Sequence, residues 1–279
     1  MKYILLSHDV DHIKPSEHFF NDLIIPKFII RSKLELFLGK ISMKEWWLRM
    51  KDILLNNQWH QVDNIISYHK NFNIPSTFFV GVNNGKGLSY SLADATLIIQ
   101  QIIANNFDVG VHGISFNSEK GVQKEFQIFK EISKKEKFGI RMHYLRKDTK
   151  TLKYISNAGY LYDASVHAYT NPYLIDKQLI EIPLHIMDGW ILNKDKRYQC
   201  VNLEIAKKYT LETIDILHKK NIDYISILFH DRYFSSSFAT WKKWYEWLLN
   251  YLLNNNYKFI SHTDLAISLL QKNESEKST

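Results

Sequence analysis

Near the start of the chain lies the stretch Tyr3-Ile4-Leu5-Leu6-Ser7-His8-Asp9-Val10-Asp11-His12, an apolar run of strand length that ends in two carboxylates. Side chains two residues apart on a strand point to the same face, so Asp9 and Asp11 point together. Two like charges held side by side are costly unless a cation or a proton lies between them. The pair therefore indicates half of a metal site or of an acid–base site, with a solvated acidic turn as the alternative at this stage.

Length and composition limit the classes of protein to consider. The 279 residues, 45% of them hydrophobic, can bury one substantial core. The formal net charge of +7 comes from scattered lysines, without the compact basic run that favours a nucleic-acid partner. The single cysteine, Cys200, excludes an internal disulfide framework and suits a reducing compartment.

No stretch approaches the roughly 20 apolar residues of a membrane helix, and the N-terminal apolar run is too short for a signal peptide. We expect a globular cytoplasmic protein without an integral membrane segment.

Predicted strands and helices alternate along most of the chain, which is typical of a parallel sheet or barrel. Strand-like runs fall at 76–82, 107–113, 139–144, 160–165, 179–185, 224–230 and 258–261, and helical patterns at 62–68, 92–105, 124–135, 149–157, 203–220 and 239–255. No linker divides the chain, so we expect a single domain over 1–272 and a frayed tail over 273–279.

An aromatic-rich helical insertion is predicted at about 13–60. Its apolar residues recur at helical spacing, and Pro26 marks a break. The segment could cover the mouth of a site, lie on a membrane surface or pack as core, and aromatic stripes at this spacing favour core packing.

Polar residues stand at the C-terminal ends of several predicted strands. His112, Arg141, Asp163 and His230 occupy such positions, as Asp9 and Asp11 do. Barrels of alternating strands and helices gather their reacting groups at these ends. A lone buried histidine is usually structural, but this many polar residues at equivalent positions predict one shared site.

The order of these residues resembles the polysaccharide deacetylases of the NodB-homology type, carbohydrate esterase family 4. The similarity runs from Ser7 to about Leu270 and is closest to a branch associated with surface-polysaccharide biosynthesis. The motifs that carry it are His8-Asp9-Val10-Asp11 and Arg141-Met142-His143-Tyr144-Leu145-Arg146. The resemblance implies an irregular (β/α) barrel and a metal-dependent hydrolase that removes an acetyl group from an N-acetylated sugar unit or precursor.

The resemblance also implies catalytic roles. Asp9 would be the general base, and Arg141 would orient and charge-balance it. His230, in Ile-Leu-Phe-His-Asp, would be the general acid. Asp163 or Asp188 would be the carboxylate that raises the pKa of His230, and the sequence does not choose between them. These roles agree with the needs of amide hydrolysis, which are an activated water, a stabiliser for the oxyanion and a proton for the leaving amine.

The implied metal is a divalent ion, with zinc favoured, and its first ligands would be Asp11 and His112. The family usually places a second histidine four residues after the first, but this chain has Phe116 there, which cannot bind a metal. Asn117, one position further along, is the predicted third ligand, weaker than imidazole. His143 is the alternative third ligand.

The implied partner is a carbohydrate. We expect His143 and Tyr144 to contact an N-acetyl sugar, and the diffuse basic charge would suit a nucleotide-linked or lipid-linked one. A second hypothesis is a non-catalytic protein of this fold that binds glycan or a partner, its metal site decayed at Phe116. A third is another amidohydrolase, which cuts a formyl group or a cyclic amide. The oligomeric state is left open.

Overall fold

The computed structural model describes residues 2–19, 22–194, 196 and 198–277. Its strands are β1 (Tyr3–Val10), β2 (Thr77–Val80), β3 (Asp108–Gly113), β4 (Ile140–Met142), β5 (Tyr162–Asp163), β6 (Tyr173–Leu174), β7 (Ile180–Glu181), β8 (Ile186–Met187), β9 (Tyr224–Leu228) and β10 (Lys258–Phe259). They form one ten-stranded sheet in the order β6-β7-β5-β4-β3-β2-β1-β9-β8, with β10 paired to β1. Every pair is parallel except β6 with β7.

The strand that contains the first motif lies at the centre of this sheet. β1 pairs with β2 on one side and with β9 on the other, and Ser7 is in register with Thr77 and with Leu228. The strand is buried from Ile4 to Val10. A near-continuous apolar run is what a parallel strand covered on both faces requires. The carboxyl end of β1 therefore opens at the middle of the sheet edge.

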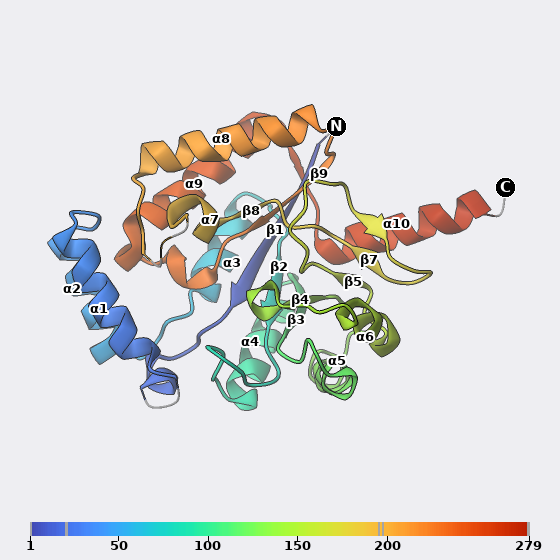
Figure 1. Cartoon of the computed structure of the whole chain (residues 1–279), viewed down its shortest axis with the longest axis horizontal. Helices are drawn as coiled ribbons and strands as arrows, with labels where there is room; N and C mark the ends of the chain where they lie inside the picture. Colours follow the sequence, from blue (N-terminus) through green and yellow to red (C-terminus); the bar gives the residue numbers. More distant parts are fainter. Residues whose placement is uncertain (1, 20–21, 195, 197, 278–279) are drawn as a thin grey trace.

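Helices cover the sheet in the alternating order that the sequence predicts. They are α3 (Val62–Asn71), α4 (Leu92–Ala104), α5 (Glu119–Ser133), α6 (Thr151–Ala158), α7 (Asp188–Leu192), α8 (Leu203–Lys219), α9 (Ala239–Asn254) and α10 (His262–Lys277). Figure 1 shows α4, α5 and α6 on one side of β1 and α8 and α9 on the other. The predicted irregular (β/α) barrel is confirmed. The strand order does not close between β6 and β8 in the described residues, which leaves the barrel incomplete.

The end of the chain is helical over most of the segment for which the sequence predicts fraying. α10 continues to Lys277. Residues 278 and 279 lie outside the described part of the chain.

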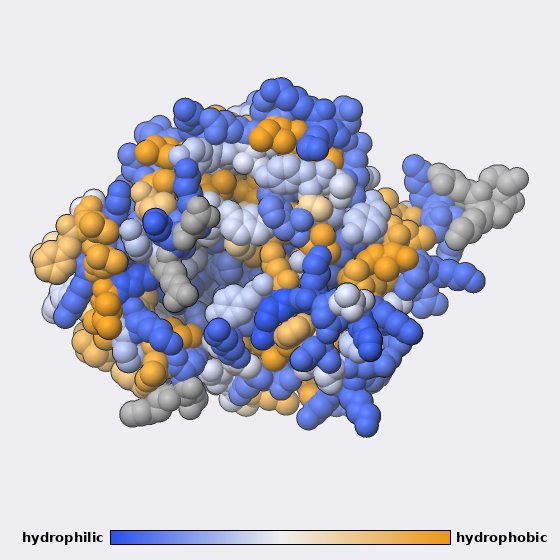
Figure 2. All heavy atoms as spheres, in the orientation of Figure 1, coloured by the Kyte–Doolittle hydropathy of each residue, from blue (hydrophilic) through white to orange (hydrophobic). Residues whose placement is uncertain are grey.

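Four short or medium helices follow β1 and stand beside its carboxyl end. They are η1 (Pro15–His18), α1 (Ile24–Phe37), α2 (Met43–Lys51) and the π-helix η2 (Asp52–Asn56). One face of these helices packs as core, because Ile25 and Phe28 are buried. The other face does not, since Phe37 and Trp47 are 88% and 64% exposed. Figure 2 shows this apolar surface along α1 and α2, so the expectation of core packing holds for only one side of the segment.

A buried ion pair attaches these helices to the barrel. Arg49 of α2 contacts the carboxylate of Glu35 of α1, and its Nε donates to the carbonyl oxygen of Ser237 at 2.9 Å. The second oxygen of Glu35 accepts from the backbone nitrogen of Gln199 at 2.9 Å. None of the helices in the described part of the chain is both long enough and apolar enough to cross a membrane.

Candidate active site

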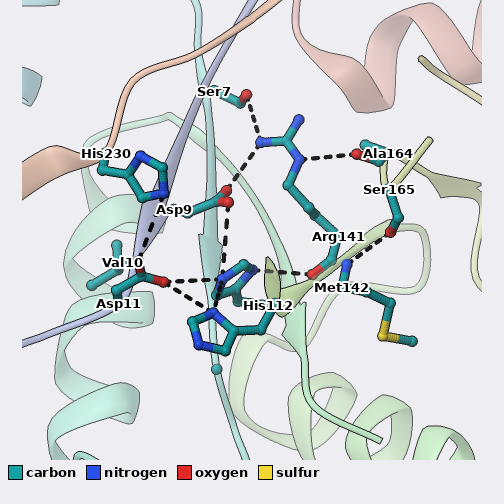
Figure 3. Close-up of polar contacts among 12 residues, drawn as sticks. Ser7, Asp9, Val10, Asp11, His112, Arg141, Met142, Ala164, Ser165 and His230 are labelled. Atoms are coloured by element: carbon teal, nitrogen blue, oxygen red, sulfur yellow. Dashed lines mark hydrogen bonds and ion pairs between the residues drawn. The ribbon is translucent and has the colours of Figure 1, made fainter. Parts of the chain in front are cut away.

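The polar residues of the sequence motifs converge at the carboxyl ends of the central strands. Asp9 ends β1 and Asp11 follows it, while His112 in β3 is in register with Arg141 in β4. His230 lies two residues after β9. Because parallel strands bring their carboxyl ends to one edge of the sheet, residues far apart in the chain meet there. Figure 3 shows these side chains pointing toward one another.

Asp11, His112 and His143 form a tight cluster whose ligand-type atoms all lie within 4.8 Å of one another. His112 Nε2 lies 3.1 Å from Asp11 Oδ1 and 2.9 Å from His143 Nδ1. His143 Nδ1 lies 3.3 Å from the same Asp11 oxygen. This is the arrangement of one carboxylate and two imidazoles that suits a divalent ion such as zinc.

The outer nitrogens of both imidazoles are held by backbone carbonyls. His112 Nδ1 donates to the carbonyl oxygen of Arg141 at 3.0 Å, and His143 Nε2 donates to that of Lys86 at 2.9 Å. In the neutral rings, the proton is therefore on the outer nitrogen and the lone pair faces inward. Such hydrogen bonds are the usual way in which proteins orient metal-binding histidines.

Two facing lone pairs beside a carboxylate repel each other unless a cation or a proton lies between them. Burial by itself would raise the pKa of Asp11, but the neighbouring His143 and His112 outweigh it and hold that pKa well below its usual value. The cluster therefore carries an ionised carboxylate and two inward nitrogens. The residues present fit a divalent cation.

Asn117 is placed differently from the other predicted ligands. It is exposed in the loop between β3 and α5, whereas Asp11 and His112 meet His143. Phe116, at the position of the family's second histidine, has the Arg146 guanidinium 5.0 Å from its ring centre. His143 directly follows β4, at the carboxyl end of the sheet where Asp11 and His112 also lie.

Tyr144 stands beside the cluster in an uncommon backbone conformation. Tyr144 and Leu145 have φ angles of 58° and 52°. The left-handed region costs a non-glycine residue about 1–2 kcal/mol, and such residues gather at functional sites. The turn leaves Tyr144 62% exposed, with its ring centre 4.1 Å from that of His143.

Asp9 is held on the other side of the cluster by a buried arginine. Arg141 donates through one terminal nitrogen to Asp9 Oδ1 at 3.0 Å and to Ser7 Oγ at 2.7 Å, and through Nε to the carbonyl oxygen of Ala164 at 3.0 Å. The other carboxylate oxygen of Asp9 lies 3.9 Å from His112 Nε2. Asp9 therefore has one oxygen fixed and one turned to the cluster.

His230 pairs with Asp188, at the start of α7. The ring Nδ1 donates to both carboxylate oxygens, at 2.9 and 3.1 Å, and the backbone nitrogen of His230 donates to Oδ2 at 2.7 Å. Burial would lower the pKa of His230, but Asp188 raises it well above the ordinary value. Its Nε2 lies 3.7 Å from Asp11 Oδ2. The histidine is thus cationic and faces the cluster.

Of the two carboxylates that the sequence leaves open, Asp188 pairs with His230 and Asp163 does not. Asp163 Oδ1 accepts from Ser165 Oγ at 2.6 Å, and Ser165 Oγ in turn accepts from the backbone nitrogen of Met142 at 2.8 Å. Asp163 also lies in register with Glu181 of β7, and both are buried. Burial, then Asp163, raises the pKa of Glu181 to about 10. The two carboxyls therefore share a proton behind Arg141, away from the reacting atoms.

Solved structures share this fold across nearly the whole chain. A putative polysaccharide deacetylase from Mycobacterium smegmatis is 16% identical, with a TM-score of 0.63 over 97% of this chain and 91% of that one. Puue allantoinase is 14% identical, with a TM-score of 0.63 over 95% and 88%. A CE4 family pseudoenzyme from Bacillus anthracis is 11% identical, with a TM-score of 0.52 over 95% and 65%. These likenesses confirm the polysaccharide deacetylase fold.

At the level of sequence, no family model and no curated protein matches the chain. The fold therefore carries the likeness, and the reaction has to be argued from the site.

The cluster predicts which substitutions remove a bound ion. We expect His143→Ala and Asp11→Ala to weaken divalent-ion binding by roughly tenfold or more, because each removes one of three inward ligands. Asn117→Ala is the matched control and should bind the ion like the wild type. The strength of ion binding is compared by the metal content of each protein after equilibration with zinc and gel filtration. Loss of the ion from Asn117→Ala with retention in His143→Ala would reverse the assignment.

The shared proton predicts a pH-dependent stability. The folded chain keeps a proton that Glu181 releases on unfolding above its ordinary pKa of 4.5. Stability from this group therefore falls as pH rises toward its folded pKa, by up to about 1.4 kcal/mol per pH unit. In Glu181→Gln an amide donor replaces the proton, so this contribution should disappear.

Urea unfolding at several pH values between about 7 and 9 measures the difference in slope between Glu181→Gln and the wild type. Exposed Glu131, changed to Gln, is the control for loss of a carboxylate. Equal slopes in all three proteins would show that the buried pair does not retain a proton.

Proposed function

We propose that this chain is a divalent-metal-dependent hydrolase that removes an acetyl group from an N-acetylated sugar unit or precursor in surface-glycan biosynthesis. The observation that carries the proposal is the single cluster of Asp11, His112 and His143, with Asp9 on one side and His230 on the other. A carboxylate base, a cationic histidine and a cation site are the three parts that amide hydrolysis needs.

Asp11, His112 and His143 are the proposed ligands, and zinc is the proposed ion because it favours imidazole and carboxylate in a site with an open position. When bound, such an ion polarises the acyl carbonyl and lowers the pKa of a water molecule. His143 replaces Asn117 in this assignment. The backbone carbonyls behind the two imidazoles keep their lone pairs turned inward without any substrate present.

Asp9 is the proposed general base. Arg141 and its contacts fix Oδ1, so the oxygen that faces His112 is free to take a proton from the attacking water. Arg141 also compensates the negative charge of Asp9 in a buried place, where an unpaired carboxylate would be costly. The arginine thus compensates the charge of the base and directs it, and touches no reacting atom itself.

His230 is the proposed general acid. Asp188 holds the imidazole through Nδ1 and favours its cationic form, so that Nε2 carries a proton. That nitrogen lies 3.7 Å from Asp11 Oδ2 (Figure 3). Proton transfer from Nε2 to the leaving amine nitrogen completes cleavage of the acyl–nitrogen bond.

Tyr144 is the proposed carbohydrate contact, because an exposed aromatic ring beside the cluster offers a face to a pyranose. A nucleotide-linked or lipid-linked sugar and a cytoplasmic location belong to the same proposal. We further propose that residues 1–272 act as one deacetylase-like domain, with the helices at about 13–60 as an insertion.

A non-catalytic role has weaker support. The likeness to a pseudoenzyme shows that proteins described as inactive share this fold. The reason to suspect decay in this chain was Phe116, and His143 supplies the nitrogen that Phe116 lacks. The likeness to an allantoinase keeps cyclic amides among the substrates to be compared.

The direct test is acetate release by the zinc-loaded protein from N-acetyl sugars, free and nucleotide-linked, beside N-formyl sugars and a cyclic amide. We expect acetate from at least one N-acetyl sugar. Asp9→Ala should reduce turnover by about 10²–10⁴-fold, because a general base is lost, with metal content unchanged. Sugar binding without acetate release under any added divalent metal would favour the non-catalytic role.

The pairing of His230 predicts different effects for two buried carboxylates. Asp188→Asn should lower kcat by roughly 10²-fold, because the general acid loses the partner that keeps it protonated and oriented. Asp163→Asn is the matched control and should change kcat little. Initial rates at saturating substrate measure both. A large loss in Asp163→Asn together with normal turnover in Asp188→Asn would instead make Asp163 the partner of His230.

A further inference from the structure

Arg232 is a buried arginine at the rim of the reaction centre. It lies in the 3₁₀ helix η4 (Asp231–Phe234), two residues after His230, and is only 8% exposed. The proposed chemistry makes no use of it. Burying a charged group is costly unless it is paired, so its surroundings indicate what it is for.

Aromatic rings surround the guanidinium. Its central carbon lies 4.5 Å from the ring centre of Trp59, 4.9 Å from Phe28, 5.3 Å from Phe238 and 5.5 Å from Tyr233. Phe28 belongs to α1, and Trp59 follows the insertion helices in the chain. Ring faces attract a cation and hold its plane, but they accept no strong hydrogen bond. The rings therefore position Arg232 without satisfying its donors.

Arg232 differs in this from the other two buried arginines of the described chain. Arg141 pairs with Asp9, and Arg49 pairs with Glu35. For Arg232, no carboxylate of the described residues lies within ion-pair distance, and its buried Nε has no acceptor. An arginine presents five donors in a fixed fork. Arg141 also has one buried nitrogen without an acceptor, but it has a carboxylate partner. Among the buried arginines of the described residues, Arg232 alone combines such a donor with the lack of a carboxylate partner, so its Nε–H calls for an acceptor.

Two carboxylates of this region already have other partners. Glu35 is shared, since it contacts both Arg49 and, at 3.4 Å, Arg31. One oxygen of Asp231 accepts from the backbone nitrogen of Gln61 at 2.8 Å rather than from Arg232. Burial, together with Arg31 and Arg49, lowers the pKa of Arg232 to about 10, so the guanidinium remains charged at neutral pH.

The position of Arg232 connects it with the substrate. The ring of Trp59, whose centre lies 4.5 Å from the central carbon of Arg232, lies 5.4 Å from the ring of His12, which is next to Asp11. Figure 2 shows that the face of the molecule at the carboxyl end of β1 is hollowed near its centre, beside the insertion helices. A sugar with its acyl group at the cluster would have its other substituents close to this wall.

We propose that Arg232 is the anchor of a binding site for an oxyanion of the substrate, a carboxylate or a phosphate, held against the aromatic wall that Phe28 and Trp59 form. That the bound anion belongs to the substrate rests on the proposed function. That the site binds an anion rests on the unpaired arginine alone. Both anions match the guanidinium fork by two parallel hydrogen bonds. The source is either an acidic sugar or a phosphate that links the sugar to a carrier.

Anion binding is measured in the absence of any reaction, so the result does not depend on whether the protein is catalytically active. The probes are glucuronate for the carboxylate, inorganic phosphate for the phosphate and glucose as the neutral control, titrated by calorimetry at constant ionic strength set with chloride. We expect one anion to bind and glucose not to bind. Arg232→Gln should weaken anion binding by about tenfold or more, the loss of a charge-assisted bidentate contact.

Matched variants separate this site from other causes. Lys33→Gln removes an equal charge from the exposed surface of α1 and should bind the anion like the wild type. Asp11→Ala should also retain the anion, which separates the site from any anion held by a metal. Arg232→Lys keeps the charge without the fork and should fall between wild type and Arg232→Gln.

The outcomes are distinguishable from those of the acetate assay. Preference for glucuronate indicates an acidic sugar, and preference for phosphate indicates a phosphate-linked one. Equal affinity in wild type and a folded Arg232→Gln, or no binding of either anion to the wild type, overturns the proposal while leaving the hydrolase proposal intact. If Arg232→Gln does not fold, a rise in the wild-type melting temperature with anion over chloride, smaller in Arg232→Lys, supports the site, and no rise in the wild type overturns it.

Discussion

The buried contacts of Arg141 are the constraint on which the reaction centre depends. The guanidinium fixes Asp9 and Ser7 of β1 and the carbonyl oxygen of Ala164 after β5, while the backbone carbonyl of the same residue orients His112. One residue of β4 therefore sets the direction of the Asp9 carboxylate and of one imidazole in the cluster of Asp11, His112 and His143. Breaking such a buried pair typically costs about 3–5 kcal/mol, because the remaining charge is left uncompensated.

Local environment, rather than residue type, assigns different roles to the carboxyls of this site. Asp188 accepts three hydrogen bonds from the ring and backbone of His230, so it stabilises a cation that faces the cluster. Asp163 instead meets Glu181 in a buried place without a cation, so the pair retains a proton. The same chemical group thus supports proton donation in one place and supports the packing behind Arg141 in the other.

The helices between β1 and β2 add a wall that the barrel by itself does not have. Their inner face is tied to the barrel by Arg49 and Glu35, and their outer face remains apolar and exposed. Within this wall Arg232 is surrounded by rings and lacks an acceptor. In the proposed function, the chemistry at the strand ends and the recognition of the rest of the substrate are supplied by different parts of the chain, which allows one fold to serve several substrates.

The sequence by itself determined the barrel, because strand and helix periodicities alternate and polar residues recur at strand ends. It also identified Asp9, Asp11, His112, Arg141 and His230, since each is placed at the sheet edge by its own strand. The tertiary structure alone decided that His143 rather than Asn117 joins the cluster, that Asp188 rather than Asp163 meets His230, and that Arg232 lacks a partner. The physical reason is that these contacts depend on turns and helix starts. Their backbone direction does not follow from the period of a strand or helix, and the partners are far apart in the chain, with 42 residues separating Asp188 from His230.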